Sequence, residues 1–191
     1  MNDTPVHFAR WISILAHPLV MVALLVAVPA MRRSSAEAIR SLLVVVIAAV
    51  VPIAFLMFYQ VRRGRRSNVD ASNPSERPIL FTFAVAGLVA GLGWLLANDP
   101  QSFLVRGMLV STVFLLVAAL LTRWVKPSLH VAFVALAATT LSLLGSAVGY
   151  LLVAVVPVVF WSRIALARHR IRELVVGLVL GVLAGFALVG L

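Results

Sequence analysis

The chain has 191 residues, of which 63% are hydrophobic and 12% charged, and its mean hydropathy is +1.11. A soluble domain has about 25% charged residues, so this composition excludes a soluble globular protein and predicts one that is covered by lipid. The net charge of +10 comes almost entirely from arginine. These arginines lie in short loops between apolar runs, where membrane topology places them, so the charge does not indicate nucleic-acid binding.

Apolar runs of transmembrane length follow one another along the chain. About 20 apolar residues in a helix cross the ~30 Å hydrocarbon core of a bilayer. Single spans are predicted for residues 11–29, 41–59, 79–97, 103–121 and 174–191. Residues 129–161 are too long for one span, and Gly145-Ser146 near their middle indicates a tight turn between two short, closely packed helices. The prediction is an all-α polytopic transmembrane bundle, residues 1–191 forming a single integral membrane domain with seven spans or, as the alternative, six.

Loop charges predict how this bundle sits in the membrane. With seven spans, twelve basic residues fall on the side that holds the N-terminus and four on the other. Excess arginine and lysine mark the cytoplasmic side, so the N-terminal side is predicted to be cytoplasmic. Trp11, Trp124 and Trp161 fall at that boundary and Trp94 near the opposite one, as interfacial aromatic residues should. Because arginine over lysine is typical of GC-rich bacteria, the predicted location is a bacterial inner membrane.

Two features inside the predicted spans are interpreted as packing. His17 precedes Pro18 in the first span, and we interpret it as a packed residue that caps a backbone carbonyl freed by the proline. Gly177, Gly181 and Gly185 form a stripe that lets another helix approach closely. Packing within the chain is the favoured use of this stripe, and a homodimer interface is the alternative.

Three polar clusters interrupt the apolar sequence. Residues 70–78 read Asp-Ala-Ser-Asn-Pro-Ser-Glu-Arg-Pro, residues 126–130 read Lys-Pro-Ser-Leu-His, and residues 162–173 contain Ser-Arg, His169 and Glu173. If residues 129–161 form a hairpin, two spans separate each cluster from the next, and all three reach the same membrane face. Buried ionisable groups cost about 2.5–3.5 kcal/mol each in a membrane, so their grouping indicates a functional site.

The residue types in these clusters fit phosphoryl transfer. Glu173 and His169 are four residues apart, so on a helix the carboxylate can hold one imidazole nitrogen and leave the other as a nucleophile. His130 can protonate a leaving oxygen. Donors for phosphate oxygens are supplied by Arg77, Arg163, Ser128 and Lys126. This set requires no metal and no other cofactor.

The clusters resemble the three motifs of the type 2 phosphatidic acid phosphatase superfamily, which are Lys-x6-Arg-Pro, Pro-Ser-Gly-His and Ser-Arg-x5-His-x3-Asp. Here they read Asp70-x6-Arg77-Pro78, Pro127-Ser128-Leu129-His130 and Ser162-Arg163-x5-His169-x3-Glu173. The resemblance covers residues 70–180. It implies attack on phosphorus by His169, orientation of that ring by Glu173, and protonation of the leaving group by His130. It assigns phosphate binding to Arg77, Arg163 and Ser128.

Three positions depart from the family motifs. Asp70 stands where the family has lysine, Leu129 where it has glycine, and Glu173 where it has aspartate. The candidates that could replace the missing lysine are Lys126, Arg65 and Arg66.

The predicted function is hydrolysis of a lipid phosphate or diphosphate at the cytoplasmic face, with phosphatidic acid, phosphatidylglycerol phosphate and a polyprenyl diphosphate as candidate substrates. Two alternatives stay open. Asp70 favours a family relative that binds lipid or a partner without catalysis. Asp70 with Asn73-Pro74 also resembles the first motif of intramembrane prenyltransferases, which hold Mg²⁺-diphosphate between paired aspartate-rich motifs. The six acidic residues of this chain are not clustered in that way.

Overall fold

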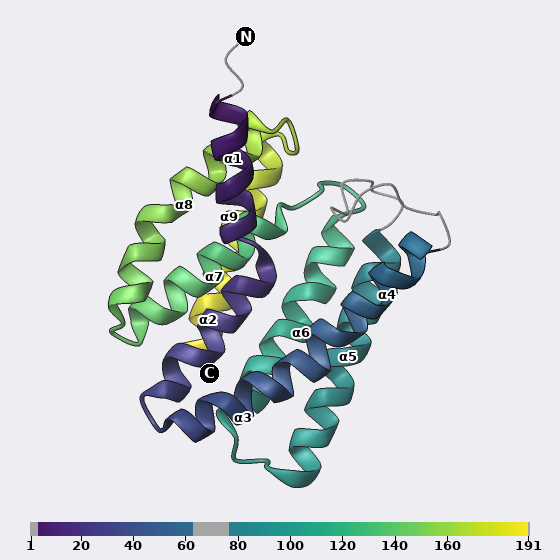
Figure 1. Ribbon diagram of the computed structural model, residues 1–191, viewed down its shortest axis with the longest axis vertical. Helices are drawn as coiled ribbons and strands as arrows, with labels where there is room; N and C mark the ends of the chain where they lie inside the picture. Colours follow the sequence, from purple (N-terminus) through teal and green to yellow (C-terminus); the bar gives the residue numbers. More distant parts are fainter. Residues whose placement is uncertain (1–3, 63–76, 191) are drawn as a thin grey trace.

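The structure is a computed structural model that describes residues 4–62 and 77–190. Every described element is a helix, which confirms the predicted all-α class. In chain order the elements are α1 (Thr4–Leu15), α2 (Pro18–Met31), α3 (Ser35–Val45), η1 (Val46–Val50), α4 (Val51–Arg62), α5 (Arg77–Asn98), α6 (Phe103–Leu121), α7 (Leu129–Leu143), α8 (Ala147–Ala165) and α9 (Ile171–Gly190). They form two groups (Figure 1). One contains α1, α2, α7, α8 and α9, and the other contains α3, η1, α4, α5 and α6.

Several of these helices have the length and composition of membrane spans. Four of them, α5, α6, α8 and α9, are long and apolar enough to cross a membrane. A fifth crossing is added if α1 and α2, which are bent by 41° at their junction, count as one broken span. Ile39–Ile53 and α7 are apolar but shorter. The described chain therefore has the helices of a polytopic membrane protein, with four to five candidate spans by length and composition.

Proline reshapes the first two predicted spans. Pro18 has no N–H, so the first predicted span is divided into α1 and α2. His17 is the N-cap of α2, and its side chain accepts a hydrogen bond from the amide of Leu19. This bond uses Nδ1 alone, and the capping of a freed carbonyl by His17 stays a prediction. In the second span, Pro52 cannot donate to the carbonyl of Ala48, and the chain widens there into the π-helical turn η1.

The turn predicted within residues 129–161 lies at Gly145. α7 ends in a Schellman motif, in which Gly145 has φ +67° and its amide donates to the Ser142 carbonyl at 2.9 Å. The Ser146 amide donates to the Leu141 carbonyl at 2.8 Å. Arg32, which follows α2, donates to the carbonyl of Leu144, the C-cap of α7, at 2.7 Å and to the Gly145 carbonyl at 3.2 Å. A side chain from another part of the chain thus binds a carbonyl that has no partner within the helix.

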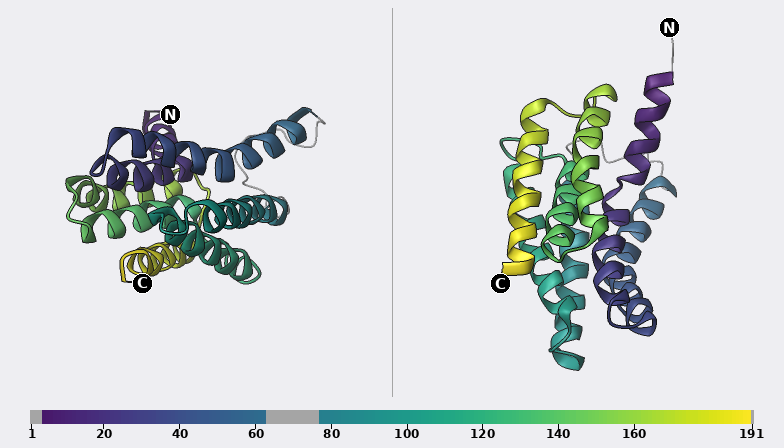
Figure 2. Two further views of the ribbon diagram at one scale, coloured as in Figure 1. Left: turned by 90° about the horizontal axis from the view of Figure 1, so that it is seen from below. Right: turned by 90° about the vertical axis from the view of Figure 1, so that its left-hand side faces the viewer.

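α7 is enclosed by protein. Ten of its fifteen residues are buried. At about 1.5 Å per residue it is ~22 Å long, less than the ~30 Å hydrocarbon core of a bilayer. It lies between the α1–α2 pair and α9, and α8 packs against it after the turn (Figure 2). A helix that is too short to cross the membrane alone is therefore covered by its neighbours.

The glycine stripe of α9 packs against α7 of the same chain. A Cβ added at Gly177 would come within 2.6 Å of the Ser128 carbonyl oxygen, and one added at Gly181 within 2.1 Å of the Ala132 carbonyl oxygen. Gly185 is also buried against α7. The stripe has the intramolecular use that the sequence favours. A homodimer formed through these three glycines stays a prediction, and it would have to use a face of α9 that α7 occupies within the chain.

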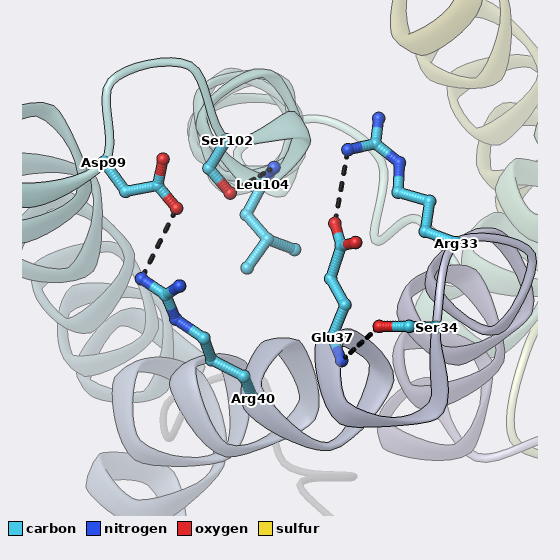
Figure 3. Close-up of polar contacts among 7 residues, drawn as sticks. All are labelled: Arg33, Ser34, Glu37, Arg40, Asp99, Ser102 and Leu104. Carbon is cyan, nitrogen blue, oxygen red and sulfur yellow. Dashed lines mark hydrogen bonds and ion pairs between the residues drawn. The ribbon is translucent and has the colours of Figure 1, made fainter.

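Ion pairs connect helices at the end of the bundle away from the N-terminus (Figures 1 and 3). Arg40 of α3 pairs with Asp99, which follows α5, at 3.5 Å between Nη2 and Oδ2. Arg33 pairs with Glu37 at 3.2 Å, and its guanidinium lies 5.0 Å from the centre of the Phe103 ring at the start of α6. Each pair is partly exposed and contributes little stability alone. Together they fix α3 beside the α5–α6 connection.

Gly181→Ala tests the close packing of α7 and α9. The new methyl group would meet a backbone oxygen at 2.1 Å, so we expect the free energy of unfolding to fall by about 1–3 kcal/mol. Gly93→Ala in α5 is the matched control, because nothing lies within 4 Å of its added Cβ, and it should stabilise by up to ~1 kcal/mol. Thermal unfolding in detergent measures both, and equal midpoints for the two variants would contradict the packing.

Candidate active site

The second and third polar clusters meet where α7 and α9 begin. The amide of Ser128, the N-cap of α7, donates to the carbonyl of Glu173, in the first turn of α9, at 3.0 Å. Arg163, in the last turn of α8, is buried beside them. The hairpin of α7 and α8 therefore returns the chain to the end where it started, as the spacing of the clusters predicts.

His169 and Glu173 form a close pair. His169 Nδ1 and Glu173 Oε2 are 2.8 Å apart, and only 3% and 14% of the two side chains are exposed. His169 precedes α9, which corrects the expectation that both residues lie on one helix. They meet because Glu173, the third residue of α9, reaches back and accepts from the amide of Arg170 at 3.3 Å. One carboxylate therefore caps the helix and orients the imidazole.

A left-handed turn brings His169 back beside the end of α8. Ala167 has φ +51°. Its amide donates to the Ile164 carbonyl at 2.8 Å, and the Arg168 amide donates to the Arg163 carbonyl at 3.1 Å. This is again a Schellman motif, with alanine where glycine is usual. The left-handed conformation costs alanine about 1–2 kcal/mol, and such strain is common near functional sites.

His130 and Arg163 come together near His169. His130, in the first turn of α7, is close enough to Arg163, His17 and His169 to interact with them electrostatically. The Nη1 atom of Arg163 donates to Ser13 Oγ of α1 at 2.6 Å. The ring of His17 lies perpendicular to that of His130, with 5.5 Å between the ring centres. The structure thus groups the two predicted histidines with the predicted arginine. It adds Ser13 of α1 and His17, the N-cap of α2.

Sequence reasoning missed Ser13 and His17 as members of this group. The position of His17 inside an apolar span could have indicated its membership, because burying an ionisable side chain in a membrane costs free energy and such side chains usually have a partner. Nothing in the sequence marks Ser13, because its hydroxyl meets Arg163 only in the folded structure.

Ser128 lies behind this group. It is completely buried, and its Oγ has no hydrogen-bond partner among the residues that the structure describes. It does not line the cavity described next. The structure therefore places the Ser128 side chain near the site without bringing it to the cavity, and its role as a phosphate ligand stays a prediction.

A cavity of about 680 Å³ begins at these clustered side chains and extends between the two groups of helices. One end, hereafter the basic end, is lined by His17, Lys126, His130, Arg163, Arg168 and His169. The middle is lined by apolar side chains of four helices, among them Val22, Phe81, Leu115 and Phe133. The far end is lined by Arg33, Gln101 and Arg106. The cavity thus joins a cationic end to a long apolar body.

Positive charge exceeds negative charge at the basic end. Of the three acidic residues that the structure describes, only Glu173 lies there, because Glu37 and Asp99 pair with arginines elsewhere. Cations gathered around one carboxylate repel one another, and an anion that enters relieves that repulsion. The basic end is therefore suited to bind an anion.

Two predicted positions lie at or beyond the edge of the described structure. Arg77 begins α5, whose first turns contribute Leu80 and Phe81 to the cavity, but its side chain is outside the described part. Asp70, together with Arg65 and Arg66, falls outside the described residues.

Comparisons with known proteins identify no relative. No protein-family model, no curated protein and no solved structure matches the chain. The resemblance to the phosphatase superfamily therefore depends on the three motifs alone.

Ala167→Gly tests the turn that carries His169. Glycine adopts φ +51° without the steric penalty that alanine has there. Glycine also loses more conformational entropy on folding, which offsets part of this gain. We therefore expect the free energy of unfolding to rise by up to about 1 kcal/mol. Ala154→Gly, at an exposed position in the middle of α8, should instead lower it by about 0.5–1 kcal/mol. Thermal unfolding distinguishes the two, and destabilisation by both would show that the turn is not left-handed.

Proposed function

We propose that the chain is a membrane-embedded phosphatase that hydrolyses lipid phosphates or diphosphates through a phosphohistidine. The observation that carries this proposal is the His169–Glu173 pair at the basic end of an apolar cavity. The basic end fits a phosphate and the apolar body fits a lipid chain, so the cavity matches both parts of one amphipathic substrate. Phosphatidic acid, phosphatidylglycerol phosphate and a polyprenyl diphosphate all have this form.

In the proposed first step, Nε2 of His169 attacks phosphorus. Nδ1 carries the ring hydrogen and donates it to Glu173 in a hydrogen bond, which keeps the attacking lone pair on Nε2 and stabilises the charge that the ring gains. The bond from phosphorus to the lipid oxygen breaks as the nitrogen–phosphorus bond forms. His130 transfers a proton to the departing oxygen, so the lipid leaves as an alcohol or, from a diphosphate, as a monophosphate.

In the proposed second step, water attacks the phosphohistidine. His130, now neutral, accepts a proton from that water as the new oxygen–phosphorus bond forms. The nitrogen–phosphorus bond breaks, its electron pair returns to His169, and inorganic phosphate leaves. Arg163 and Lys126 line the cavity at this end and would stabilise the negative charge on the phosphoryl oxygens in both steps. Arg77 is proposed as a further phosphate ligand.

The proposed topology has seven crossings. The α1–α2 pair forms the first, the continuous α3, η1 and α4 form the second, and α7 is a short crossing inside the bundle. Contacts between helix ends support this alternation. Ser128 and Glu173 join the starts of α7 and α9, and Arg106 of α6 donates to the Leu188 carbonyl at the end of α9 at 3.2 Å.

We place the basic end of the cavity on the cytoplasmic side of a bacterial inner membrane. Twelve of the sixteen basic residues fall on that side in the seven-crossing arrangement. This placement favours a substrate that is made in the inner leaflet.

Cysteine labelling tests the orientation, and the chain suits it because it has no cysteine of its own. Arg123→Cys lies after α6 at the proposed cytoplasmic side, and Pro100→Cys lies in the α5–α6 connection at the other side. We expect a membrane-impermeant maleimide to label Pro100→Cys in spheroplasts and to label Arg123→Cys only after lysis. The reverse pattern would place the site at the periplasmic face.

A second candidate function is lipid binding without catalysis. Two observations favour it. Asp70 replaces the lysine of the family motif, and Ser128 does not line the cavity. The same cavity would then hold a lipid phosphate that is not hydrolysed.

Phosphate release from a panel of lipid phosphates by the purified protein, with EDTA present, tests the proposal. We expect release by the wild type and by His7→Ala, which changes an exposed histidine of α1, and none above background by His169→Ala. Binding of a lipid phosphate without any release would support the second candidate and overturn the first.

Glu173 variants sharpen the same assay. Glu173→Gln removes the charge that stabilises the imidazolium, so we expect release to fall by ~10²- to 10⁴-fold. Glu173→Asp, which restores the residue of the family motif, should retain more activity. Equal activity of both variants would show that the carboxylate does not act on His169.

A further inference from the structure

Pro18 changes the hydrogen bonds at the end of α1. A continuous helix would pair the amide of residue 18 with the Ile14 carbonyl and the amide of His17 with the Ser13 carbonyl. Pro18 has no N–H, and the His17 amide donates to the Ile14 carbonyl at 3.1 Å instead. The Ala16 amide donates to an earlier carbonyl. The carbonyl of Ser13 therefore receives no bond from the amides that follow it.

His130 lies beside the acceptor that Pro18 frees. Its ring is within reach of the backbone of Ser13. The group that can accept from the ring is the Ser13 carbonyl, because the amide of a residue inside α1 is bonded to the preceding turn. The hydroxyl of the same residue accepts from Arg163 at 2.6 Å. One residue of α1 therefore holds the proposed general acid with its carbonyl and a proposed phosphate ligand with its hydroxyl.

His17 adds a contact from the other side of the break. Its Nδ1 accepts from the amide of Leu19 at 3.3 Å, which fixes the ring and leaves the hydrogen of the neutral imidazole on Nε2. The fixed ring lies perpendicular to the ring of His130. His17 and Pro18 both line the cavity, so the break is part of the wall at its basic end.

We propose that the break between α1 and α2 is a positioning element of the site, which holds His130 and Arg163 in place for phosphoryl transfer. Pro18 makes the Ser13 carbonyl available, and His17 supports the ring that the carbonyl holds. The inference rests on the proposed function, and the positioning residues lie outside the three polar clusters. With one ring nitrogen bound to Ser13, the other nitrogen of His130 serves the departing oxygen.

Pro18→Ala tests this inference. Alanine restores an amide that can donate to Ile14, and the released His17 amide then competes with His130 for the Ser13 carbonyl. We expect kcat for phosphate release to fall by ~10- to 100-fold with KM little changed, because the general acid is displaced while the phosphate ligands remain. Pro157→Ala is the matched control. This proline lies inside α8, is exposed and does not line the cavity, so its kcat should equal that of the wild type.

Ser13→Ala separates the two roles of Ser13. It keeps the carbonyl and removes only the hydroxyl that Arg163 binds, so we expect KM to rise about tenfold and kcat to fall less than in Pro18→Ala. A general loss of structure would lower kcat equally in both variants, whereas the proposed roles give opposite patterns in kcat and KM.

Imidazole ¹⁵N NMR of histidine-labelled protein gives a readout that does not need turnover. The four histidine signals are assigned with His130→Gln and His17→Gln. We expect the His130 signal to change in Pro18→Ala and to keep its wild-type position in Pro157→Ala. An unchanged His130 signal in folded Pro18→Ala would overturn the inference. Absence of phosphate release by the wild type would overturn the proposed function instead, and the spectrum would still decide whether the break positions His130.

Discussion

The enclosure of α7 by protein is the constraint on which the other features depend. This helix is too short to cross a bilayer alone, and its polar start would be costly at membrane depth if its backbone groups and side chains met lipid. Its neighbours remove that cost. Gly177 and Gly181 let α9 approach until the Ser128 amide reaches the Glu173 carbonyl, and α8 returns along α7 after a left-handed glycine. The contacts that cover α7 therefore also bring His169 and Glu173 beside His130.

Glu173 is the electrostatic centre of the basic end. Its carboxylate caps α9 and holds the imidazole of His169, so folding of the helix and orientation of the ring depend on the same oxygen. Among the described residues, three cations at this end, Lys126, Arg163 and Arg168, accompany this one negative charge. Apolar side chains line the cavity beyond them, where a low dielectric strengthens interactions between charges. This arrangement gathers positive charge where the phosphate of the proposed substrate would bind and leaves the apolar middle of the cavity for its hydrocarbon.

Local sequence signals predicted much of the fold. The apolar run at residues 103–121 corresponds to α6 residue for residue, and Gly145 marks the turn between α7 and α8. The three predicted residues His130, Arg163 and His169 lie together because α7 and α8 form the predicted hairpin, which returns the chain to the end where α7 begins. The position of His169 before α9 was not predicted, since the left-handed conformation of Ala167 has no glycine to indicate it. The role that we propose for the break in the first span was also missed. Pro18 predicts a freed carbonyl, but the residue that we propose as its partner lies on a helix more than a hundred residues away in the sequence, and only tertiary packing brings it near.

The division of the helices into two groups has a mechanical consequence. The described helices α3 to α6 form one group, which in the sequence lies between α2 and α7 of the other, so two described segments connect the groups, residues 32–34 and 122–128. The cavity lies between the groups, so a lipid bound there as proposed would contact both of them. Residues 122–128 connect the groups and contain Lys126, which lines the basic end of the cavity. Under the proposed function, a change in the spacing of the two groups would therefore also move a residue that binds the phosphate.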